Sequence, residues 1–373
     1  MKKMEELFHA FEPNMIKLYW DQYTSPRMEF FSNEVPGVDF GSGFLVAVKH
    51  GFMDIPHIHD GADNFFIFTG PTLDNMWEDE FEVDMFMGDS AQSMEMYKIT
   101  KPTLVHVPAG VWHCPVYYKN PGKGINNFMW YRGISTGRVY PKIDDNGQPT
   151  VFYEKDNWVH PCKYEPEKNC VYCGRCFSQS EDYVNEYMKP FFENISHEGK
   201  YANCIYELKK DYHNLGDAVV SPRTTFGQDD LPFIDREFSF NTIIKPCKLG
   251  DDEPVSNGQI AEFIWFSGAD SVDPWNSFDA EIEIMLGADP EHMEKVTFDK
   301  PGVIAVHPGI WRGPITVKRV GKPLFMMPWY MSNKERYKIV QKTLDGKKVK
   351  VFEEKSDITD PTPGDELFMF LKK

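Results

Sequence analysis

The stretch GFMDIPHIHDGADNFFIFTG, residues 51–70, carries the residues on which the interpretation of the whole chain depends. His57 and His59 are separated by one residue, so on a β-strand both imidazoles would leave the same face. Asp63 follows after a short bend, and the apolar run 65–69 is typical of a strand that ends at Gly70. Imidazoles and a carboxylate are ligands that first-row transition metals accept, so this stretch predicts a metal site.

A second stretch, PAGVWH at residues 108–113, supplies another imidazole about forty residues later. Pro108 and Gly110 predict a turn just before His113. Three imidazoles and one carboxylate from separate strands would leave metal positions for an exogenous ligand.

The first stretch resembles the first metal-binding motif of the cupins, a superfamily of small β-barrels. That motif reads G-x5-H-x-H-x3,4-E-x6-G, and five positions of this chain match it, with Asp in place of Glu: Gly51, His57, His59, Asp63 and Gly70. The second stretch is similar to the second motif, G-x5-P-x-G-x2-H-x3-N, at Pro108, Gly110 and His113. Pro102 stands where that motif has its leading Gly, and Tyr117 where it has its closing Asn.

The resemblance implies a divalent transition metal, Fe, Mn, Zn or Ni, and it implies four ligands. These are His57, His59, Asp63 and His113. Because Asp is shorter than the usual Glu, Glu82 is the first substitute for Asp63. His106 is interpreted as a core or surface histidine.

An internal repeat decides the predicted architecture. FFIFTG (65–70) returns as FIWFSG (263–268), EVDMFMG (82–88) as EIEIMLG (281–287), and GVWH (110–113) as GIWR (309–312). The offset drifts only from 196 residues, between Ser25 and Ser221, to 200, between Val151 and Val351. This tandem duplication, taken with the resemblance, predicts a mainly β chain of two tandem cupin (jelly-roll) β-barrels, a bicupin, with a Cys-rich insert between them.

The second copy lacks the ligand set of the first. The places of the four candidate ligands hold Val255, Asn257, Ala261 and Arg312, and none of these is an imidazole or a carboxylate. The metal is therefore expected in the first barrel alone. Glu82 keeps a counterpart, Glu281, which favours a structural role for that carboxylate.

The expected boundaries follow from the repeat. They are an N-terminal helix over 1–20, the metal-binding barrel over 21–159, an insert over 160–205, the second barrel over 206–356 and a tail over 357–373. The helix is predicted from near-helical spacing of apolar residues such as Leu7, Phe11 and Leu18.

The insert contains Cys162, Cys170, Cys173 and Cys176. The C-x2-C-x2-C run is of the kind that holds a [4Fe–4S] cluster, with Cys162 or the more distant Cys204 as the fourth ligand. A structural zinc site is the alternative, although such sites usually draw paired cysteines from two loops. Unligated thiols are the third interpretation.

Composition limits the partners and the compartment. A net charge of −17 argues against nucleic acid and anionic membranes, since both need basic patches. Seven cysteines, an odd number, do not form a secreted disulfide framework, so a cytoplasmic location is expected. A small-molecule substrate is the expected partner, and the chain could act as a homo-oligomer.

The sequence therefore favours a metal-dependent enzyme that acts on a small organic substrate in the first barrel. The resemblance covers lyases, decarboxylases, isomerases and dioxygenases and does not choose among them. Arg132, whose counterpart is Met331, could anchor a substrate carboxylate beside an aromatic wall that includes Phe128 and Trp130. The alternative is a non-catalytic bicupin that binds or stores small molecules.

Overall fold

The computed structural model divides the chain into two compact units. One is Pro13–Glu207, called here the N-terminal barrel, and the other is Met1–Glu12 with Leu208–Lys373, called the C-terminal barrel. The structure describes residues 4–11, 16–17, 27–30, 40–53, 56–59, 63–77, 80–132, 138–143, 146, 149–153, 195–213, 215–227, 230, 236–250, 252–256, 258, 261–331 and 337–354.

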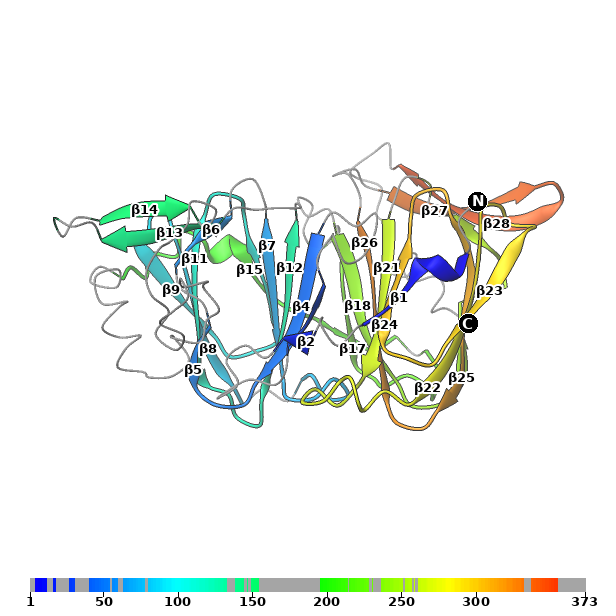
Figure 1. Cartoon of the computed structure of the whole chain (residues 1–373), viewed down its shortest axis with the longest axis horizontal. Coiled ribbons are helices and arrows are strands. Elements are labelled where there is room, and N and C mark those ends of the chain that lie inside the picture. The colour runs from blue at the N-terminus through cyan, green and yellow to red at the C-terminus, as the bar shows by residue number, and fades with distance from the viewer. Residues whose placement is uncertain are drawn as a thin grey trace, which may run out of the picture. The chain divides into compact units, whose positions relative to one another are not determined.

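The N-terminal barrel is built from antiparallel sheets (Figure 1). Its largest sheet has the order β15 (Ile205–Glu207), β10 (Thr103–Val107), β7 (Asn64–Thr69), β12 (Ile125–Arg132), β4 (Phe40–Ala47), β3 (Arg27–Phe30), β2 (Ile16–Lys17). A second sheet has the order β5 (Gly51–Met53), β11 (Trp112–Asn120), β8 (Glu82–Gly88), β9 (Met94–Ile99). A third, smaller sheet joins β14 (Pro149–Tyr153), β13 (Arg138–Ile143) and β6 (Ile58–His59).

The C-terminal barrel contains a large sheet of matching strand order. It runs β1 (Phe8–Ala10), β24 (Gly302–Val306), β21 (Ala261–Gly268), β26 (Leu324–Met331), β18 (Arg236–Ile243), β17 (Arg223–Phe226), β16 (Lys210–Asp211). The other sheet runs β23 (Met293–Phe298), β22 (Ala280–Gly287), β25 (Trp311–Val320), β20 (Val255–Ser256), β28 (Lys347–Glu354), β27 (Tyr337–Leu344), and β19 (Cys247–Leu249) pairs with β25.

The N-terminus differs from the helix expected over residues 1–20. Met4–Leu7 is a single 3-10 turn, η1, and Phe8–Ala10 then forms strand β1 on the edge of β24. The apolar residues favour a helix only weakly by their spacing, whereas the edge of β24 supplies backbone hydrogen-bond partners for an extended strand. The pairing continues beyond β1, where Phe11 N donates to Pro301 O at 3.0 Å. The described residues 4–11 therefore belong to the C-terminal barrel and do not form the expected helix.

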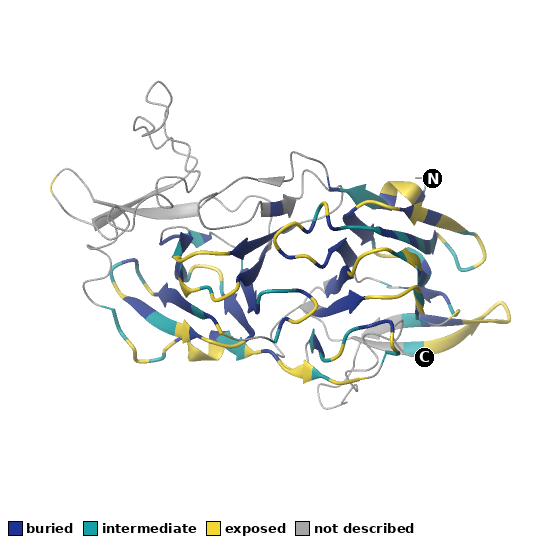
Figure 2. Ribbon diagram, turned by 90° about the horizontal axis from the view of Figure 1, so that it is seen from below, coloured by how far each residue is buried: buried dark blue, intermediate teal, exposed yellow. Residues whose placement is uncertain are grey.

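Strand alternation decides which side chains enter the N-terminal barrel. On β7, Phe66 and Phe68 belong to the core between the sheets, as do Ile125 and Met129 on β12. Phe128, on the other face of β12, stacks on Phe44 with ring centroids 4.3 Å apart. Figure 2 shows the buried residues, in dark blue, concentrated on the central strands of each unit.

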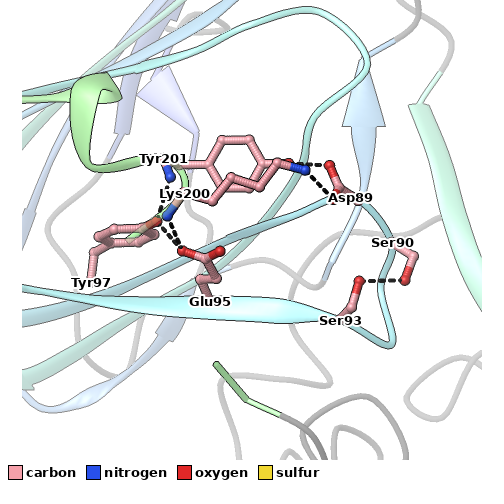
Figure 3. A network of polar contacts seen from close by, with 7 residues as sticks. All are labelled: Asp89, Ser90, Ser93, Glu95, Tyr97, Lys200 and Tyr201. Carbon is pink, nitrogen blue, oxygen red and sulfur yellow. Dashed lines mark hydrogen bonds and ion pairs between the residues drawn. The ribbon is translucent and has the colours of Figure 1, made fainter. Parts of the chain in front are cut away.

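The described residues at the end of the expected insert are held on the N-terminal barrel by a polar network (Figure 3). The Tyr201 hydroxyl donates to Asp89 Oδ1 at 2.5 Å, and the Lys200 ammonium pairs with the same carboxylate. The backbone amide of Lys200 donates to Glu95 Oε2 at 2.8 Å, and that of Tyr201 donates to the Tyr97 hydroxyl at 2.7 Å. Burial and the neighbouring Asp89 both raise the pKa of Tyr201.

η4 (Ala202–Cys204) and β15 follow this network, and β15 pairs with β10 of the same barrel. Within the described residues, no helix combines the length and the apolar character needed to cross a membrane.

Candidate metal site

Two adjoining backbone segments bring the three predicted histidines together. His57 lies just before β6, His59 ends it, and His113 is the second residue of β11. His57 N donates to His113 O at 3.0 Å, and His113 N donates to His57 O at 2.9 Å. This antiparallel bridge fixes the two motif segments side by side, so the imidazoles arise from adjacent backbone positions.

The three imidazoles are arranged as ligands of one ion would be. All three residues are buried, with exposed fractions of 2% for His57, 3% for His59 and 1% for His113. Their ligand nitrogens lie within 4.8 Å of one another, and the Nε2 atoms of His57 and His59 are 3.2 Å apart. Two nitrogens bound to one zinc-like ion at about 2.0–2.1 Å would be separated by roughly 3.0–3.4 Å. The His57–His59 pair therefore has the spacing of two ligands of the same metal.

A backbone carbonyl orients the third imidazole. His113 Nδ1 donates to Val111 O at 3.0 Å, and Val111 follows the Pro108–Gly110 turn. Because Nδ1 carries the proton in this bond, the lone pair is on Nε2 and faces the other two histidines. Outer hydrogen bonds of this kind fix the ring orientation of metal-binding histidines.

Asp63, expected as the fourth ligand, has other partners. Its Oδ1 accepts from Ala109 N at 3.0 Å, and its Oδ2 lies 3.2 Å from His106 Nε2. In the part of the chain that the structure describes, no carboxylate joins the group of three histidines. Asp63 thus ties the loop after His59 to the turn before His113, and His106, expected to be a plain core or surface histidine, is its partner.

Asn64, the residue after Asp63, lies beside the imidazoles. It shares the inner face of β7 with Phe66 and Phe68, because those residues follow it at intervals of two. It is 1% exposed, and its Nδ2 donates to His113 Nε2 at 3.1 Å. Sequence reasoning missed this residue, although alternation back from Phe66 and Phe68 could have identified it.

The C-terminal barrel fills the matching positions with an ion pair. The match of residues 263–268 with 65–70 puts Glu262 in the place of Asn64, and Arg312 stands in the place of His113. Arg312 Nε donates to Glu262 Oε2, and its Nη2 donates to the Tyr330 hydroxyl at 3.2 Å. Burial alone would lower the pKa of Arg312, but the Glu262 carboxylate raises it above its usual value. Val255 takes the place of His57, so this interior holds a buried salt bridge where the other holds imidazoles.

Glu82, the named substitute for Asp63, lies elsewhere on the N-terminal barrel. It begins β8 opposite Asn120, whereas His113 pairs with Met87 near the other end of that strand. Hydrogen bonds from Lys119 and Lys98 lower the pKa of Glu82, and the two ammonium groups are 2.7 Å and 3.0 Å away. This half-buried carboxylate therefore pairs with two lysines of the same sheet.

Position 132 lies on β12 two residues beyond Trp130 and pairs with Phe40. The expected role of Arg132 as a substrate anchor stays a prediction, because the structure describes the backbone of residue 132 and not its side chain. Of the insert cysteines, Cys162, Cys170, Cys173 and Cys176 lie outside the described residues, and Cys204 is a buried free thiol whose pKa is raised by burial.

Comparison with known proteins shows that this chain is similar to solved structures in fold. No family model matches the chain, and no curated protein matches its sequence. Vicilin from Corylus avellana (hazelnut) is 12% identical with a TM-score of 0.50, over 87% of this chain and 85% of that chain. A formate complex of Lactobacillus farciminis oxalate decarboxylase is 11% identical with a TM-score of 0.48, over 87% of this chain and 86% of that chain. Oxalate decarboxylase from Bacillus subtilis at pH 4.6 is 11% identical with a TM-score of 0.47, over 88% and 78%.

Proposed function

We propose that this chain, which has the two-barrel fold of a bicupin, is a metal-dependent enzyme that acts on a small organic substrate in its N-terminal barrel. The observation that carries the proposal is the buried group of His57, His59 and His113, whose nitrogens converge within 4.8 Å. A single divalent ion could bind all three of these buried imidazoles at once.

The residues around the group suit a site with open metal positions. When bound, a divalent metal would supply Lewis-acid stabilisation of substrate oxygens. The chain itself orients the ligands, through the Val111 carbonyl on His113 and through the bridge between His57 and His113. On β4, alternation from the core residues Leu45 and Ala47 puts Gly41 and Gly43 on the inner face, where they add no side chain. The second copy has Ser239 in the place of Gly43, so the first barrel has more room for a ligand at this position.

The identity of the metal, among Fe, Mn, Zn and Ni, and the type of reaction are part of the same proposal. Lyase, decarboxylase, isomerase and dioxygenase chemistry all use a metal with positions free for substrate. A cytoplasmic location and a homo-oligomeric state are proposed on composition alone.

The insert is proposed to hold a second inorganic site. Cys170, Cys173 and Cys176, with Cys162, have the spacing of [4Fe–4S] ligands, and structural zinc is the alternative. Protein purified without oxygen should be brown if a cluster is present. Colourless protein with one tightly bound zinc beyond the barrel metal would instead establish the zinc site.

Metal analysis tests the central proposal. Anaerobically purified protein should contain one transition metal in the barrel, and His57→Ala with His59→Ala should remove it while the far-ultraviolet circular dichroism is unchanged. An equal metal content in this variant would refute the assignment. The variant should also lose turnover of any compound that the wild type converts in a screen of small carboxylates and carbonyl compounds.

A non-catalytic bicupin that binds or stores small molecules is the second candidate. It is favoured by the C-terminal barrel, where the positions that match Asn64 and His113 hold the buried ion pair of Glu262 and Arg312. Metal-dependent binding of a compound with no change in it over long incubation would support this function over catalysis.

A further inference from the structure

We infer that Asn64 supplies the fourth protein ligand of the N-terminal metal site through its side-chain carbonyl oxygen, in place of Asp63. The inference rests on the proposed function, because it assumes that His57, His59 and His113 bind one divalent metal. It adds the identity of the fourth ligand and, from the charge of that ligand, the class of compound that the open positions favour.

Asn64 lies beside the imidazoles, where a fourth ligand would lie. Asn64 Nδ2 is 3.1 Å from His113 Nε2, the nitrogen whose lone pair faces the other histidines. Rotation of the amide by half a turn exchanges its nitrogen and oxygen without moving the rest of the side chain. Oδ1 would then lie where the amide nitrogen lies now, close enough to share an ion with that imidazole.

In the present orientation of the amide, Asn64 Oδ1 is buried and accepts no hydrogen bond from any residue that the structure describes. Leaving a buried acceptor unpaired costs about 1–3 kcal/mol, and turning the amide toward a bound ion would give this oxygen a partner. The Asp63 carboxylate, by contrast, already accepts from Ala109 N at 3.0 Å and contacts His106.

The C-terminal barrel uses the matching position in the same way. Glu262 occupies the position that matches Asn64, and its carboxylate binds Arg312, which occupies the position that matches His113. In both barrels the first inner residue of this strand therefore contacts the residue of the second motif. The fold thus directs this position, and not the preceding one, toward the site.

A neutral fourth ligand changes the electrostatics of the site. Three imidazoles and an amide carry no charge, so a divalent metal would keep both positive charges, whereas a carboxylate would cancel one. Since opposite charges attract strongly in a buried site, the open positions should favour an anionic oxygen ligand, such as a carboxylate or an enolate.

The test uses Co²⁺, whose visible absorption reports its ligands, with the full-length metal-free protein. Asn64→Leu keeps the volume and removes the oxygen, so the Co²⁺ affinity should fall at least tenfold with a changed absorption spectrum. Asn64→Asp should bind Co²⁺ at least tenfold more tightly, and its Co²⁺ form should bind azide several-fold more weakly than the wild-type Co²⁺ form. Asp63→Asn is the matched control, because it keeps an oxygen for the Ala109 amide, and its Co²⁺ affinity should stay within about twofold.

The outcomes separate this inference from the proposed function. If Asp63→Asn weakens Co²⁺ binding tenfold while Asn64→Leu does not, Asp63 is the ligand and the inference is wrong. If Asn64→Leu binds Co²⁺ with unchanged affinity and spectrum, the site has three protein ligands and the inference is again wrong. If the wild type itself takes up no Co²⁺, the proposed function and the inference fail together.

Discussion

Removal of one partner from the buried ion pair of the C-terminal barrel should destabilise that barrel strongly. Glu262 is fully buried and Arg312 is 1% exposed, so Glu262→Leu would leave a guanidinium in the interior without its carboxylate. Breaking a buried pair in this way costs about 3–5 kcal/mol. With a urea slope of about 2 kcal/mol per molar, the unfolding midpoint of this barrel should fall by roughly 1.5–2.5 M.

The matched control removes the whole polar group. In Glu262→Leu with Arg312→Met and Tyr330→Phe, no charge and no hydroxyl stays behind, because the Tyr330 hydroxyl accepts from Arg312 at 3.2 Å. Replacement of an entire buried ionic group by apolar residues of similar volume is often neutral or stabilising. The triple variant should therefore recover most of the stability that the single variant loses.

Hydrogen exchange at increasing urea concentrations provides the measurement. Peptides from β21 and β25 report the C-terminal barrel, and peptides from β7 and β11 report the N-terminal barrel as an internal reference. The reasoning is refuted if Glu262→Leu costs less than about 1 kcal/mol, or if the triple variant is as unstable as the single one.

Three further changes test other parts of the structure. Asp84 is buried, and burial raises its pKa, so the stability of the wild type should fall as pH rises above the ordinary carboxyl pKa. Urea titrations from pH 4 to 8 should show this fall in the wild type and not in Asp84→Asn. Phe11 packs on Trp265 with ring centroids 4.3 Å apart, so Phe11→Ala should cost the C-terminal barrel about 3–5 kcal/mol in the same exchange experiment, whereas equal loss in both barrels would contradict the assignment of the N-terminus. Tyr201→Phe removes the hydrogen bond to Asp89 and should cost about 1 kcal/mol, seen as faster amide exchange over residues 195–207 and nowhere else.

The sequence was sufficient for the fold and for the three histidines. Short apolar runs with period two, closed by Gly and Pro, specify strands whatever lies around them, and the H-x-H spacing alone puts two imidazoles on one side of a strand. The third histidine followed from the resemblance of the second motif, and the structure brings His113 against His57 as that resemblance implied.

The conformation of the N-terminus and the position of Asn64 beside the histidines depended on tertiary structure. Residues 4–11 have no strong preference of their own, and the free edge of β24 decides their conformation through backbone hydrogen bonds that no local pattern reveals. The choice between Asp63 and Asn64 depends on where β7 begins, since a shift of one residue exchanges the inner and outer faces of a strand.

The same reason applies to the faces of β12 and to the ion pair of the second barrel. The sequence showed that Phe128 and Trp130 share one face of a strand, but only the packing of Ile125 and Met129 in the core shows which face that is. It also showed that His113 becomes Arg312, whereas the partner Glu262 was found only in the structure. Composition and periodicity determine which elements form and which residues alternate together, while the register between strands decides which of two faces meets the interior, because that register is fixed by contacts between residues far apart in the chain.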